Sequence, residues 1–190
     1  MKISNDSISP ILNNPYEEPK WHYDVTLDGN LDYSKILEGR RPYSAHLTVM
    51  PDTSSSKSLF SAEDIPREDA NAQFINGIRQ VVKEWREQGY PKVTRTSRDL
   101  LTYWFLNPER ELTKSLFFCQ REAVETAIYL NEVAPRDPNL GRSILHELDM
   151  RRETISDHYE DILPRTAFKM ATGTGKTVVM AMLILYHLYQ

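Results

Sequence analysis

The stretch RTAFKMATGTGKTVVMAMLILYHLYQ, residues 165–190, decides how the rest of the sequence is interpreted. A short segment, AFKM at 167–170, precedes a loop rich in glycine and threonine at 171–177. An almost wholly apolar segment follows and runs to Tyr189. A strand, a glycine loop and a helix in this order are typical of a phosphate-binding loop. We therefore expect residues 167–170 to form a strand, and a helix that is buried on all sides to begin near Lys176.

The residue types of the loop suit a phosphate ligand. Gly173 and Gly175 let the backbone turn so that successive N–H groups point at one anion. Lys176 would bring a positive charge to the β- and γ-phosphates, and Thr177 would offer its hydroxyl to Mg²⁺. The loop alone therefore predicts a site for a nucleoside triphosphate.

Two positions depart from the strict phosphate-loop pattern. Met170 stands where that pattern has its first glycine. Lys169 is unusual in a strand that is expected to lie inside a parallel sheet. The alternative interpretation is a turn rich in Gly and Thr in front of a core helix.

Residues 170–177, MATGTGKT, resemble motif I of superfamily 2 helicases and translocases, in which the first position is often not glycine. Gln120, in CQREAVETAIYL, resembles the glutamine-bearing motif that recognises adenine in that superfamily. NNPYEEPKWHYDV at 13–25 and GRRPY at 39–43 are similar to the N-terminal lead-in of the R subunit of type III restriction enzymes. The chain thus resembles the N-terminal part of that helicase-like subunit.

The resemblance implies an ATP-dependent translocase on double-stranded DNA, with ATP and Mg²⁺ as cofactors and a methyltransferase subunit as a partner. Lys176 and Thr177 would be the catalytic residues, and Thr177 would hold Mg²⁺ through the nucleotide. Gln120 would hydrogen-bond the adenine edge. The residues expected to bind nucleotide are Gln120, Thr172, Gly173, Thr174, Gly175, Lys176 and Thr177.

Other features depart from the family pattern. Gln120 and Lys176 are further apart than in compact helicases, and residues 134–160 look like an insertion. The acidic motif, the second RecA-like domain with its arginine finger and any nuclease motif are not seen in the sequence. We therefore expect the isolated chain not to turn over ATP. Two alternatives stay open: a truncated remnant or interaction module that keeps the loop without turnover, and a different P-loop enzyme such as a small kinase.

Composition narrows the function classes. The 190 residues include 23 basic and 27 acidic side chains, a net charge of −4, so no overall basic excess indicates nucleic-acid binding. Cys119 is the only cysteine, which excludes a disulfide within the chain and a cysteine-based metal cluster. The apolar segment that ends at Tyr189 is shorter than the roughly 20 residues that cross a membrane. These features favour a cytoplasmic protein without a membrane partner.

The expected fold class is mixed α/β, with a mainly helical N-terminal module that leads into an incomplete P-loop RecA-like domain. We assign residues 1–60 to a lead-in of loops and short strands, and residues 61–112 to a helical module. Residues 113–190 would start the ATP-binding domain, with the insertion near 134–160. Alternating apolar residues predict strands at 21–27 and 45–50.

Apolar residues at helical spacing predict four helices before the loop. The first carries a stripe through Trp85 and ends at Gly89. The second would be capped by the pair Thr96 and Asp99 and end at Asn107. The third begins at Phe118, and the fourth is charged. Their expected ranges are 68–88, 96–108, 118–134 and 142–160.

Several residues also have a purely structural interpretation. The structural interpretation of Gln120 is a solvated residue at the start of a helix. The basic run Lys92, Arg95 and Arg98 fits an exposed loop better than a phosphate contact, and the five histidines lack the spacing of metal ligands. Aromatic residues that fit a core or interface better than a base-stacking surface are Trp85, Tyr103, Trp104 and Phe105.

Overall fold

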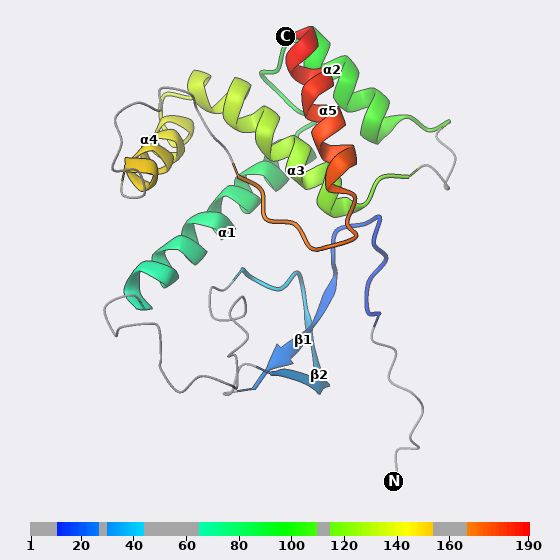
Figure 1. The fold of residues 1–190 in the computed structure, drawn as a ribbon, viewed down its shortest axis with the longest axis vertical. Helices are drawn as coiled ribbons and strands as arrows, with labels where there is room; N and C mark the ends of the chain where they lie inside the picture. The colour runs from blue at the N-terminus through cyan, green and yellow to red at the C-terminus, as the bar shows by residue number, and fades with distance from the viewer. Residues whose placement is uncertain (1–10, 27–29, 44–64, 110–114, 154–166) are drawn as a thin grey trace. The chain divides into compact units, whose positions relative to one another are not determined.

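The computed structural model describes residues 11–26, 30–43, 65–109, 115–153 and 167–190, and structural statements refer to these residues. The chain divides into two compact units, Met1–Gly77 and Ile78–Gln190, each described by itself. The described residues combine helices with one two-stranded antiparallel sheet, so the mixed α/β class is confirmed at that level (Figure 1). They do not show a P-loop domain.

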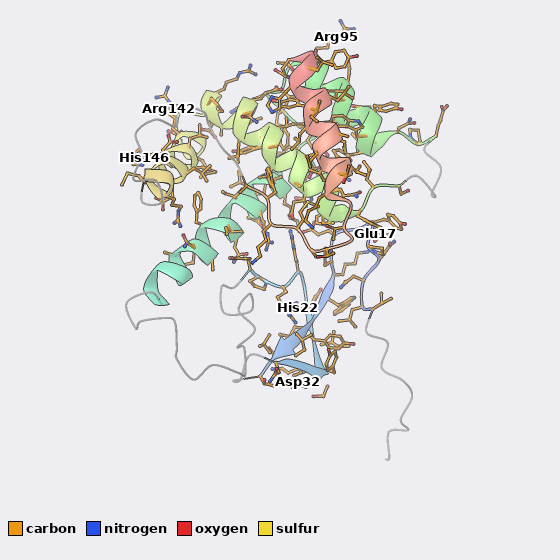
Figure 2. The ribbon with its side chains drawn as sticks, viewed as in Figure 1. Glu17, His22, Asp32, Arg95, Arg142 and His146 are labelled. Carbon is orange, nitrogen blue, oxygen red and sulfur yellow. The ribbon has the colours of Figure 1, made fainter. Side chains whose placement is uncertain are left out.

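The first unit is built on a β-hairpin. Strand β1, Trp21–Val25, pairs with β2, Leu31–Glu38, and His22 lies opposite Leu37 in the register. Figure 2 labels His22 on β1 and Asp32 on β2. The strand predicted at 21–27 is confirmed, whereas β2 was not expected. The predicted strand at 45–50 lies outside the described residues.

The lead-in residues are tied to β1 by one amide. The Asn13 side-chain oxygen accepts hydrogen bonds from the backbone N–H groups of Lys20 at 2.8 Å and Trp21 at 3.0 Å. Its nitrogen donates to the Trp21 carbonyl at 2.8 Å. From the other side, the Arg41 guanidinium donates to the carbonyl of Tyr23. The segments 13–25 and 39–43 therefore meet at the hairpin.

Helix α1, Ile65–Glu87, follows the predicted apolar period. Val82 and Trp85 are buried on its inner face. Gly89 has a φ of 77°, in the left-handed region, and the Tyr90 N–H donates to the Trp85 carbonyl, which ends the helix as expected.

Helix α2, Arg95–Leu101, begins two residues earlier than a Thr96 cap would allow. Its cap is Thr94, whose extended backbone lets the hydroxyl accept the Ser97 N–H at 3.2 Å. The predicted capping pair Thr96 and Asp99 is therefore wrong, because Thr96 is already helical. A π-helical turn, η2 at Thr102–Leu106, continues the segment to its predicted end at Asn107.

Helix α3, Phe118–Ile128, lies at the centre of the second unit. It continues as a π-helical turn, η4 at Tyr129–Val133, and a 3₁₀ turn, η5 at Ala134–Arg136. Helix α4, Leu140–Glu153, follows, and the rest of its predicted range lies outside the described residues. The predicted apolar stripe of α3 is confirmed, since its members are buried: Val124, Ala127, Ile128 and Leu130.

Helix α5, Lys176–Tyr189, begins where the glycine loop predicted. The preceding strand prediction is wrong, because residues 167–170 have no regular structure. A parallel strand needs a neighbouring strand for its hydrogen bonds, and the described residues supply none here. Instead, α5 packs on α3 and α2 (Figure 1).

The expectation that α5 is buried on all sides is also wrong. Only Val179, Met182 and Tyr186 are buried, and they share the face that is turned toward the other helices. Without a sheet, the helix has one packed face and one exposed face. Lys169, which would be out of place in a buried strand, is exposed.

A buried carboxylate joins three parts of the second unit. Glu125 is fully buried and accepts hydrogen bonds from Arg86 through two nitrogens, each at 2.7 Å. Arg121 donates to its other oxygen at 2.7 Å and Tyr90 at 2.6 Å. Burial, followed by the Glu125 charge, raises the pKa of Tyr90, which keeps its hydroxyl protonated as a donor. The cluster connects α1, the turn after it, and α3.

We predict that Glu125→Gln destabilises the protein strongly. The change keeps the shape but removes the only negative charge of the cluster, and breaking a buried ion pair typically costs about 3–5 kcal/mol. Urea unfolding followed by circular dichroism measures the loss. Asp149→Asn on the exposed surface of α4 is the matched control and should change stability by less than about 0.5 kcal/mol. Equal effects in the two variants would contradict a structural role for the cluster.

Candidate functional site

The glycine loop closes on one backbone carbonyl. Gly173 and Gly175 have φ angles of 80° and 74°, which residues with side chains rarely adopt. The Thr174 hydroxyl donates to the Ala171 carbonyl at 2.7 Å, and the Lys176 ammonium donates to the same oxygen at 2.8 Å. The Lys176 side chain therefore folds back over the loop and brings its positive charge there.

The loop leads directly into α5. Gly175 is the residue before the helix, and its carbonyl accepts the Val178 N–H at 2.9 Å. No side chain caps this end of the helix. The first N–H groups of a helix lack partners within it and carry its partial positive charge. Thr177, in the first turn, is exposed, so its hydroxyl is accessible.

Gln120 is attached to this loop. Its side-chain nitrogen donates to the Thr174 carbonyl at 2.9 Å, and its oxygen accepts the Phe117 N–H at 2.9 Å. The second contact is the one that a glutamine makes in the third position of a helix when it caps the first turn. Gln120 does lie at a helix start, but it is only 5% exposed, so the interpretation as a solvated residue is wrong.

A close approach explains why residue 175 is a glycine. A Cβ atom on Gly175 would lie 2.2 Å from the Gln120 side-chain nitrogen. Nothing lies within 4 Å of a Cβ placed on Gly173. The two glycines share a left-handed backbone, but only Gly175 also makes room for the amide.

The structure thus brings four of the predicted residues together: Gln120, Thr174, Gly175 and Lys176. The other three predicted residues belong to the same loop and first turn, where Thr172, Gly173 and Thr177 are exposed. Sequence reasoning missed the contact between Gln120 and the loop. The contact is hard to predict because its two partners lie far apart in the sequence. The one local signal is that Gln120 stands three residues after Phe117, the position of a capping glutamine. Adenine recognition by Gln120 remains a prediction.

A second buried carboxylate holds the opposite end of α5. Glu132 accepts the Thr94 N–H at 2.8 Å, and it also accepts hydrogen bonds from the Ser97 hydroxyl and the Gln190 side-chain amide. Tyr186 bonds to the same carboxylate, and its burial, together with the Glu132 charge, raises the pKa of that tyrosine. In the sequence, Glu132 is a single acidic residue within an apolar segment. That pattern did not predict that it would bind the end of α5.

The two attachments set the direction of the helices. The start of α3 is bound to the start of α5 through Gln120, and η4 is bound to the end of α5 through Glu132. Helices α3 and α5 therefore run in the same direction, with their N-termini together at the glycine loop (Figure 1).

The described residues form neither a cluster of metal ligands nor a membrane-spanning helix. These residues contain no group of three or more His, Cys, Asp or Glu side chains that could hold a metal ion. Among the described helices, none has the length and apolar character needed to span a membrane. The glycine loop is the arrangement whose chemistry points most directly to a ligand.

Comparison with known proteins gives no family model, no curated protein and no solved structure that matches the chain. The resemblance to superfamily 2 helicases therefore depends on the sequence motifs alone.

We predict that Gly175→Ala is more damaging than Gly173→Ala. Both variants place a side chain in the left-handed region, which costs about 1–2 kcal/mol. Only Gly175→Ala also collides with Gln120, so it should cost more. Urea unfolding of both variants measures the difference.

The Gln120→Ala background separates the two causes. Removing the amide relieves the collision at residue 175 but leaves the backbone strain, so the two glycine variants should then cost the same. The coupling between positions 120 and 175 should fall within the 0.5–3 kcal/mol that is typical of residues in contact. Additive effects would show that the side chain of Gln120 does not occupy the space beside Gly175.

Proposed function

We propose that the chain binds the phosphates of ATP, with Mg²⁺, at the loop 171–177. One observation carries the proposal: the only lysine of the loop lies over it, 2.8 Å from the Ala171 carbonyl, next to an uncapped helix start. A phosphate oxygen is a stronger acceptor for an ammonium than a neutral carbonyl is. Lys176 would therefore exchange the carbonyl for phosphate, and the exposed Thr177 hydroxyl would reach Mg²⁺.

The sequence motifs extend this proposal to a class of protein. They support an ATP-binding, N-terminal portion of a DNA translocase that resembles the R subunit of type III restriction enzymes. Double-stranded DNA and a methyltransferase subunit would be partners of such a protein, which would act in the cytoplasm. Its ATP turnover would need an acidic Mg²⁺ ligand and an arginine in addition to this loop.

A second candidate is a binding module that keeps the nucleotide loop without turnover. The absence of strand structure at 167–170 favours it, because a parallel sheet normally fixes the loop for catalysis. Steady-state phosphate release from the purified chain, with and without duplex DNA, separates the two candidates. We expect no release above that of the Lys176→Ala variant.

We predict that Lys176→Ala lowers the affinity for ATP and Mg²⁺ by 10-fold or more. A hydrogen bond to a charged group is worth about 1.5–3 kcal/mol, which corresponds to roughly a 10- to 100-fold change. Titration calorimetry with ATP measures it. Lys169→Ala is the matched control, since it removes an exposed lysine just before the loop and should leave affinity unchanged. Equal losses would show a general effect of charge, and an unchanged Lys176→Ala affinity would contradict the proposed site.

We predict that Gln120→Ala narrows the preference for ATP over GTP. An amide can donate to adenine N7 and accept from its amino group, and each lost contact costs about 1 kcal/mol. Competition between the two nucleotides for the same chain measures the ratio. An equal loss for ATP and GTP would instead assign Gln120 to holding the loop through the Thr174 carbonyl.

A further inference from the structure

We draw no further inference here: the strongest candidate, the exposed apolar face of α5 that carries Met180, Ile184 and Leu188, is a helix face for which nothing in the described part of the structure shows what covers it.

Discussion

The carboxylate of Glu125 lies fully inside the helical unit, where an unpaired charge would cost several kcal/mol. This constraint fixes its surroundings. Arg86, Arg121 and Tyr90 must all be in place to satisfy it, so α1, the turn after α1 and α3 cannot move independently. Glu132 repeats the arrangement at the other end of the same helical segment, with neutral donors from α2 and α5. Apolar packing forms the core of this unit, and the hydrogen bonds to the two carboxylates determine which helices lie next to one another.

Local patterns in the sequence predicted local structure well. The apolar period located α1 and α3, and Gly89 and Asn107 marked helix ends. The capping pair Thr96 and Asp99 was a local failure, because Thr94 caps α2 instead. The failures at the strands involve distant partners. Residues 167–170 have the composition of a strand, but a strand exists only if another one pairs with it. The reverse holds for β2, which was not predicted. Its residues do not alternate clearly between apolar and polar, but pairing with β1 makes them a strand.

The candidate site was predictable in its residue types and less so in its connections. The spacing of Gly173, Gly175 and Lys176 was sufficient to predict a glycine loop in front of a helix, and in the structure the Lys176 ammonium donates to the Ala171 carbonyl of that loop. The attachment of Gln120 to Thr174 spans more than fifty positions along the chain and leaves no local trace. It is visible only in three dimensions, where a Cβ on residue 175 would lie 2.2 Å from the Gln120 side-chain nitrogen, so that the amide would have to shift.

The parallel course of α3 and α5 has an electrostatic consequence. Two helix N-termini lie side by side at the glycine loop, so their partial positive charges add there, and both partial negative charges gather at the other end. Arg95, labelled in Figure 2, directly follows Thr94, whose hydroxyl is bonded to Gln190 at that second end. Arg136 in η5 donates to the Lys92 carbonyl at 3.0 Å. The unit is polarised along α5, with its most positive backbone where an anion would arrive.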